Sequence, residues 1–217
     1  MPVRILLADD HAILRSGLRR ILESYPGFVV AAEAASGAEA VALAREHQPD
    51  VAIVDVGMPG LNGIEATAQI LRRSPLTAVL ILSMHSDERY VVRALKAGAR
   101  GYLLKDSVER ELVQAIQAIH AGETFFSPAI AKVLSSRDAL APRSQTVEDR
   151  YDLLTERERE IYQLLAEGKS NKEIAALLCL SLHTVETHRT RVMDKLGLHS
   201  AAELVLSAVR RGLVGLP

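Results

Sequence analysis

The first 121 residues alternate five short apolar, β-branched runs with amphipathic segments, and this alternation constrains the fold more than any other feature of the chain. The runs predict strands near residues 3–8, 28–33, 51–55, 78–83 and 101–104. The segments predict helices near residues 12–24, 37–47, 62–73, 87–97 and 108–121. Short connections between such elements predict an α/β fold, a doubly wound five-stranded parallel sheet with right-handed crossovers.

Polar residues stand at the end of four of the five predicted strands or directly after it: Asp9, Asp10, Asp55, Ser83 and Lys105. Parallel strands all end at the same edge of their sheet, so side chains that are far apart in the sequence meet in one crevice there. The expected crevice holds three carboxylates, one hydroxyl and one ammonium group. That set suits a divalent cation and a phosphoryl group.

The three carboxylates, Asp9, Asp10 and Asp55, repel one another in a partly desolvated crevice, and a cation relieves the repulsion. Mg2+ takes carboxylate, carbonyl and water oxygens, so these acids and the Gly57 carbonyl in the turn DVGMPGLNG form a candidate magnesium site. Asp55 is then placed as a nucleophile that forms an aspartyl phosphate.

Ser83 and Lys105 would each contact a phosphate oxygen. Taken singly, such residues are ordinary helix caps, turn residues or solvated strand ends, and only their coincidence at one edge favours a phosphoryl site. A nucleotide site is excluded, because the glycines after the third strand lack the GxGxxG spacing and no GxxxxGK[ST] occurs.

The motifs DD, DVGMPGLNG, ILSMH and GYLLKD resemble the receiver domain of two-component response regulators over about residues 3–121, a flavodoxin-like fold. The resemblance implies that Asp55 accepts a phosphoryl group from a partner histidine kinase in a Mg2+-dependent reaction. It also implies that Tyr102 is a rotamer switch that turns inward when Ser83 moves toward the phosphoryl group. The surface of the fourth helix, fifth strand and fifth helix would then change shape and serve dimer contacts.

After Gly122 the strand pattern stops. We expect a receiver domain at 1–122, a linker with a possible short helix at 123–150, and a smaller all-α domain at 151–217. Helices are predicted near 156–167, 171–178, 184–196 and 201–211. Cys179, the only cysteine, falls in a stretch that predicts helix interior, so we expect it to be a small packed side chain.

The helices at 171–178 and 184–196 are joined by a tight turn, which predicts a helix-turn-helix whose second helix enters the DNA major groove. A helical wheel places Val185, Val192 and Leu196 toward the core. Arg189 lies beside this stripe and either pairs with an acid such as Glu156 or Glu160 or touches a base. The candidate DNA-contacting residues are Lys172, Thr184, Glu186, Thr187, Thr190 and Arg191.

This region also resembles a known family, the LuxR-type helix-turn-helix of the NarL/FixJ class, through LTEREREI, EGKSNKEIA and LSLHTVETHRTRVMDKLGL. Glu186 departs from the basic residue that is often found at its position in this family, and an acid there suits contact with a cytosine amino group or repulsion of wrong sites. The apolar helix near 201–211 is expected to meet a twin across a two-fold axis, the alternative being that the neighbouring domain covers it.

The 26 Lys plus Arg balance 27 Asp plus Glu, so the net charge of the chain argues for no polyanionic partner, and any nucleic-acid binding must come from a local patch. The single cysteine and the lack of an apolar run as long as a signal or membrane segment make the reducing cytoplasm the expected compartment. The sequence therefore predicts a transcription regulator, not an enzyme, with a histidine kinase and double-stranded promoter DNA as partners and a homodimer when phosphorylated. Two alternatives stay open. One is a Mg2+-dependent phosphatase or phosphotransferase, although Gly57 stands where such enzymes carry a second acid. The other is a protein-interaction module that never binds DNA.

Overall fold

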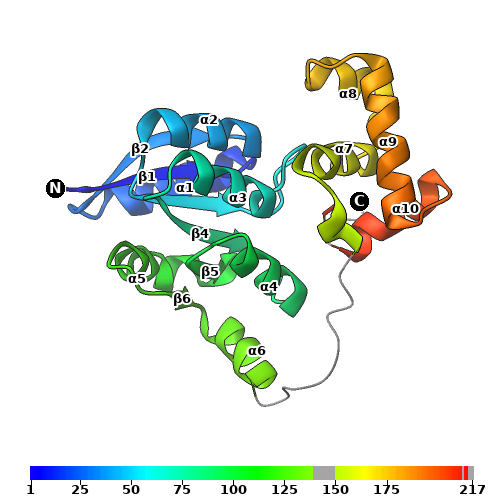
Figure 1. The fold of residues 1–217 in the computed structure, drawn as a ribbon. Helices are drawn as coiled ribbons and strands as arrows, with labels where there is room; N and C mark the ends of the chain where they lie inside the picture. Colours follow the sequence, from blue (N-terminus) through cyan, green and yellow to red (C-terminus); the bar gives the residue numbers. More distant parts are fainter. Residues whose placement is uncertain (139–149, 212, 215–217) are drawn as a thin grey trace. The chain divides into compact units, whose positions relative to one another are not determined.

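The computed structural model describes residues 1–138, 150–211 and 213–214. The chain divides into two compact units, Met1–Ala141 and Pro142–Pro217. In Figure 1 the first unit runs from blue to green and the second from yellow to red.

The first unit is built on a parallel sheet of six strands in the order β2-β1-β3-β4-β5-β6. The strands are β1 (Val3–Ala8), β2 (Phe28–Ala34), β3 (Val51–Asp55), β4 (Ala78–Ser83), β5 (Gly101–Leu104) and β6 (Phe125–Phe126). The helices are α1 (Ala12–Glu23), α2 (Gly37–His47), α3 (Gly63–Arg73), α4 (Glu88–Lys96), α5 (Val108–His120) and α6 (Pro128–Asp138), with a 3-10 turn, η1 (Lys105–Ser107).

The sheet is covered on both faces, as its apolar strands require. Alternate residues of β1 point to opposite sides, so Leu6 joins the core under α2, α3 and α4, while Leu7 joins the core under α1 and α5. Figure 1 shows these helices lying along the sheet. The predicted doubly wound α/β fold is therefore confirmed, and its strand ends form one edge.

The expected number of strands was wrong, because β6 adds a sixth. Phe125 pairs with Gly101 and Phe126 with Tyr102, in parallel register. A strand of two residues has no alternation of apolar and polar positions, so a periodicity search misses it. It falls in the segment expected to be a linker with a possible short helix. The helix is present as α6, and its Ile130 is fully buried in the core. Residues 139–149 of that segment lie outside the described residues.

The second unit is helical, with η2 (Arg150–Leu153), α7 (Glu156–Ala166), α8 (Asn171–Leu177), α9 (Leu182–Leu196) and α10 (Ala201–Arg210). Thr155 and Glu158 form a capping box at the start of α7, and Ser170 and Glu173 form one at α8. α9 begins two residues earlier than expected, because the side chain of Ser181 caps it by accepting from the Thr184 N–H.

The apolar stripe of α9 is buried as the helical wheel predicted: Val185 contacts the core formed with α7 and α8, and Val192 and Leu196 contact the core formed with α7 and α10. Cys179 was predicted wrongly. α8 ends at Leu177, and Cys179 lies in the turn after it with φ of 53° and an exposed side chain. Among the described residues, no helix is long and apolar enough to span a membrane.

Candidate functional site

Three strands deliver charged side chains to one point at the carboxyl edge of the sheet. Asp9 follows β1, Asp55 ends β3 and Lys105 follows β5. Asp9 is fully buried and Asp55 is 3% exposed. The Lys105 Nζ lies 2.9 Å from Asp9 Oδ2 and 2.9 Å from Asp55 Oδ1. Residues separated by almost a hundred positions in the sequence are thus in direct contact, as the strand-end rule predicts.

At this point two carboxylates contact one ammonium group, and burial shifts the pKa values of the groups involved. Burial raises the pKa of the Asp55 carboxyl above its usual value, and the nearby Lys105 ammonium only partly offsets this effect. Burial acts to lower the pKa of Lys105, but its contacts with Asp9 and Asp55 hold it above the usual value. Two buried carboxylates share one ammonium, so a further positive charge would be stabilised here.

An acidic cluster beside Lys105 has the donor set of a metal site. Ligand atoms of Asp9, Asp10, His11 and Asp55 all lie within 4.8 Å of one another. The Oδ1 atom of Asp10 is shielded from solvent, and among the described residues nothing donates a hydrogen bond to it, although the His11 Nδ1 lies 2.9 Å away. An acceptor of this kind is satisfied by a cation, so the cluster fits the divalent ion expected from the sequence. The sequence reasoning missed His11, although it directly follows the two acids.

Gly57 lies beside Asp55, as the turn DVGMPGLNG predicts. Its backbone N–H donates a hydrogen bond to the Asp55 carboxylate and acts to lower its pKa. A Cβ added at Gly57 would lie 3.5 Å from Asp55 Oδ2. The residue is therefore close enough to the cluster to take part, and the role of its carbonyl stays a prediction.

Ser83 and Tyr102 are both tied to the loop between β4 and α4. The Ser83 side chain is almost completely buried and its Oγ accepts from the His85 N–H at 3.0 Å. Tyr102 is fully buried and donates from its hydroxyl to the His85 carbonyl oxygen at 2.8 Å. Burial raises the pKa of Tyr102 to about 12. A single residue, His85, is thus held by both side chains that the sequence marked as phosphoryl contact and switch.

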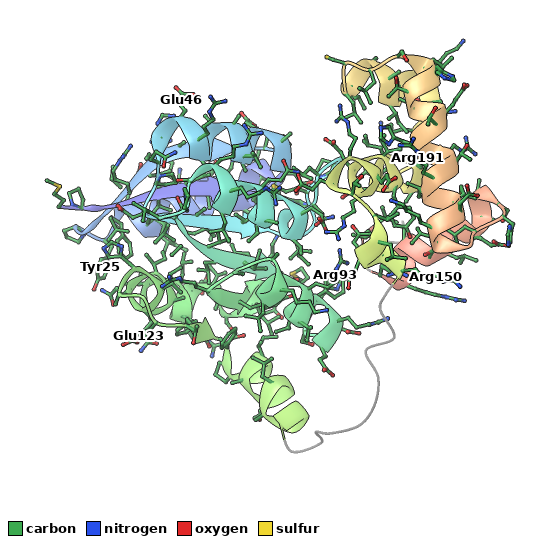
Figure 2. The ribbon with its side chains drawn as sticks, viewed as in Figure 1. Tyr25, Glu46, Arg93, Glu123, Arg150 and Arg191 are labelled. Carbon is green, nitrogen blue, oxygen red and sulfur yellow. The ribbon has the colours of Figure 1, made fainter. Side chains whose placement is uncertain are left out.

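The candidate DNA-contacting residues of the second unit are mostly accessible. Lys172, Glu186, Thr190 and Arg191 are exposed, whereas Thr184 and Thr187 are half-buried. Figure 2 labels Arg191 on α9. The hydroxyls of Thr187 and Thr190 donate to the carbonyl oxygens of His183 and Glu186 on the preceding turn, at 2.9 Å and 3.1 Å. Their contacts with a partner would therefore use the oxygen as an acceptor or the methyl group.

Arg189 has a partner that neither alternative for it named. Its Nη1 lies 3.4 Å from Asn171 Oδ1 at the start of α8. Glu160 instead pairs with Arg157 at 2.6 Å, and Arg157 also donates to the Leu178 carbonyl at 3.0 Å. The Arg157 bond connects α7 to the end of α8, and the Arg189 contact connects α9 to the start of α8.

Two family models match the chain. The model described as "Response regulator receiver domain" matches residues 5–117, and the model described as "Bacterial regulatory proteins, luxR family" matches residues 152–208. The oxygen regulatory protein NreC of Staphylococcus carnosus is 39% identical over 215 residues, with 98% of this chain and 99% of that protein covered. The response regulator GacA of Pseudomonas viridiflava is 39% identical over 212 residues, with 98% of both chains covered.

Solved structures agree with these matches. A LuxR-family two-component response regulator from Aurantimonas sp. SI85-9A1 is 44% identical, covers 64% of this chain and 99% of its own, and has a TM-score of 0.62. The response regulator RcsB in a complex with DNA is 26% identical, covers 96% of this chain and 100% of its own, and has a TM-score of 0.60.

Proposed function

This chain belongs to the response regulators that join a receiver domain to a LuxR-type helix-turn-helix, and from that membership we propose that it is a phosphorylation-dependent transcription regulator whose phosphoacceptor is Asp55. One observation carries the assignment of Asp55: its carboxylate is buried, has a raised pKa and contacts Lys105 beside Asp9. A buried carboxylate in this setting gains from a cation and from an incoming group that Lys105 binds.

In the proposed reaction a carboxylate oxygen of Asp55 attacks the phosphorus atom of a phosphohistidine on the kinase. The new P–O bond forms as the P–N bond breaks, and the imidazole leaves with the electron pair and takes a proton. Lys105, which contacts Asp55 at 2.9 Å, then pairs with a phosphoryl oxygen. Mg2+, when held by Asp9, Asp10, Asp55 and the Gly57 carbonyl, supplies positive charge that offsets the repulsion between the phosphoryl group and the carboxylates.

Phosphorylation of Asp55 would change the loop before α4 through His85, which bonds to both Ser83 and Tyr102. A phosphoryl group adds roughly −1.5 to −2 units of charge at Asp55, and the Ser83 hydroxyl gains by donating to it. Ser83 then gives up its contact with the His85 N–H, while Tyr102 is bonded to the carbonyl of the same residue. The loop before α4 is therefore coupled to phosphorylation, and the surface of α4, β5 and α5 changes with it.

The proposed output is promoter binding by α8 and α9 in a homodimer. The N-terminal turn of α9, with Thr184 and the nearby Lys172, would contact backbone phosphates, and Glu186, Thr187, Thr190 and Arg191 would face the groove. Support comes from the exposure of four of these six residues and from the likeness to the RcsB–DNA complex. Leu206 on α10 is 54% exposed and supports a contact with a second copy. The cytoplasm is the proposed compartment.

The receiver would assist its own phosphorylation and dephosphorylation without acting as an enzyme on other substrates. Gly57, two residues after the nucleophile, leaves no general acid or base at that position. Hydrolysis of the aspartyl phosphate by water is the expected fate of the phosphorylated chain.

The test compares the full chain with Asp55→Asn after incubation with Mg2+ and a small acyl phosphate. We expect phosphoprotein and tighter, salt-dependent binding to a selected duplex for the wild type, and neither change for the variant. Asp106→Asn, at an exposed acid directly after Lys105, is the matched control and should behave as the wild type. Phosphorylation of the Asp55→Asn chain at the wild-type level would overturn the assignment. Turnover of an added phosphomonoester would favour the enzyme instead.

A further inference from the structure

The residue directly after the two acids of the cluster, His11, has a side chain that the proposed phosphorylation chemistry does not use. His11 is the residue before the first turn of α1, yet its side chain makes no capping hydrogen bond to the helix. Instead its Nδ1 lies 2.9 Å from Asp10 Oδ1 and 3.3 Å from Asp9 Oδ1. The ring therefore turns back toward the carboxylates that form the metal site.

These separations match the spacing of ligands around one ion. For bonds of about 2.1 Å at right angles, neighbouring ligand atoms lie about 3 Å apart. The Nδ1 atom of His11 is at such a distance from one oxygen of each acid. Apart from the His11 Nδ1 at 2.9 Å, the described residues offer no hydrogen-bond donor to the Oδ1 atom of Asp10, so this oxygen is available as a ligand.

Lys105 occupies a different side of the cluster. It contacts Oδ2 of Asp9, whereas His11 faces Oδ1 of the same residue. The His11 backbone N–H also donates to Asp9 Oδ1 at 2.7 Å and so fixes the orientation of that carboxylate. The ammonium and the imidazole thus do not compete for one oxygen atom, and a cation beside Asp9 Oδ1 and Asp10 Oδ1 would lie next to the ring.

We propose that His11 is a ligand of the divalent cation in this crevice, through Nδ1, and that the site therefore prefers first-row transition metals such as Mn2+, Co2+ and Ni2+ to Mg2+. Imidazole nitrogen binds these ions well, whereas Mg2+ strongly prefers oxygen. With His11 the cluster offers three carboxylates and one nitrogen. This inference rests on the metal site of the proposed function and names the class of ion that it selects.

The competing explanation is a simple ion pair, in which a protonated His11 neutralises the acids. The two explanations predict different changes in cobalt affinity when His11 is removed. If His11 is a ligand, its removal weakens cobalt binding. If it is only a counter-charge, its removal frees the carboxylates and leaves cobalt binding unchanged or tighter.

The experiment is a calorimetric titration of the full chain with Co2+ and, separately, with Mg2+. We expect His11→Ala to weaken Co2+ binding by about tenfold or more, since even residues that only orient metal ligands contribute 10–100-fold, and to change Mg2+ binding by less than about twofold. His120→Ala is the matched control, because His120 is exposed at the far end of α5. Unchanged or tighter Co2+ binding by His11→Ala would overturn the inference.

A second measurement needs no variant. Co2+ is paramagnetic, so Co2+ bound in the crevice should shift the ring proton resonances of His11 strongly and those of His120 little. Equal small shifts would mean that Co2+ does not bind beside His11, which would overturn the inference, whereas strong shifts place the ion and leave coordination to the titration. Failure here is distinct from failure of the proposed function. If the chain is phosphorylated with Mg2+ but His11 does not affect Co2+ binding, only this inference is overturned. If no metal ion allows an acyl phosphate to phosphorylate the chain, the proposed function is overturned.

Discussion

The two units both bury carboxylates, but they neutralise them differently. In the second unit Glu158 is 2% exposed, and it accepts from the Lys195 ammonium at 2.7 Å and from the Thr155 N–H at 2.8 Å. In the first unit Asp9 and Asp55 share a single ammonium, that of Lys105, and Asp10 lies beside them. We call Glu158 a matched charge because it has an ammonium group to itself. Asp9 and Asp55 are unmatched because they share one, although each also accepts a backbone N–H.

The difference appears in the direction of the pKa shifts. Burial acts to raise the pKa of Glu158, but hydrogen bonds from Lys195 and Thr155 bring it below its usual value. Burial raises the pKa of Asp55, and Lys105 does not reverse it. A matched buried charge indicates a structural role, whereas an unmatched one indicates a site that gains from a ligand. The variants below test this contrast, from the largest expected effect to the smallest.

Gly63→Ala should have the largest effect on stability, because Gly63 packs directly against the backbone of Asp55. A Cβ at Gly63 would overlap the backbone carbonyl of Asp55. We expect a loss of about 3 kcal/mol in the unfolding free energy of the first unit, with weaker metal binding, measured by denaturant titration and calorimetry. Gly17→Ala, in α1 with open space around it, should gain about 0.5 kcal/mol. Equal stability of the two variants would show that the close approach is not needed.

Lys195→Ala should destabilise the second unit by removing the partner of Glu158. Breaking a buried ion pair costs about 3–5 kcal/mol, and since Lys195 is 34% exposed we expect about 2 kcal/mol in the unfolding free energy. Lys169→Ala, at an exposed lysine of the same unit, should change it little. A denaturant titration that gave the same midpoint for both variants would mean that Glu158 is not held by this pair.

Asp55→Asn should act in the opposite direction and stabilise the first unit. It removes one of the carboxylates that share Lys105, so we expect a gain on the order of 1 kcal/mol, typical of a stabilising substitution, measured by denaturant titration in metal-free buffer. Glu158→Gln is the comparison in the second unit and should lose stability. If Asp55→Asn also lost stability, the crevice would be as well matched as the second unit.

The smallest expected effect is the pH dependence of the unfolding free energy, which has opposite signs in the two units. Glu158 has a folded pKa below its usual 4.5, so its contribution is present above about that pH and is lost as the pH falls through the lower folded value. Asp55 has a folded pKa above its usual 3.8, so its contribution is present below that pH and is lost as the pH rises through the raised value. Acidification from pH 7 should therefore weaken the second unit through Glu158 and favour the first through Asp55. Hydrogen exchange resolved by unit measures both, and Asp55→Asn should abolish the second effect.

Much of the fold follows from periodicity, because long apolar runs such as 51–54 leave few alternatives to a central strand. The crevice follows as well, because strand ends must meet at one edge. The features of the fold that the sequence did not predict depend on individual contacts. Strand β6 is two residues long, and α9 begins early because Ser181, not a later residue, provides the cap.

Side-chain partners were the least predictable part of the site. Arg189 bonds Asn171, a neutral residue that a search for opposite charges does not consider. His11 was missed because its importance comes from the direction of its ring, which the sequence does not encode in any simple pattern. Cys179 is exposed because α8 ends early, at Leu177, and a short apolar run cannot reveal where a helix stops.

The most direct measurement locates the phosphoryl group itself. The full chain is phosphorylated with Mg2+ and an acyl phosphate, the acyl phosphate bond is trapped by reduction with borohydride, and the modified residue is identified by peptide mass spectrometry. The account predicts modification at Asp55, the buried acid in contact with Lys105. Modification at Asp9, Asp10 or any residue outside the crevice, or none at all, would contradict it.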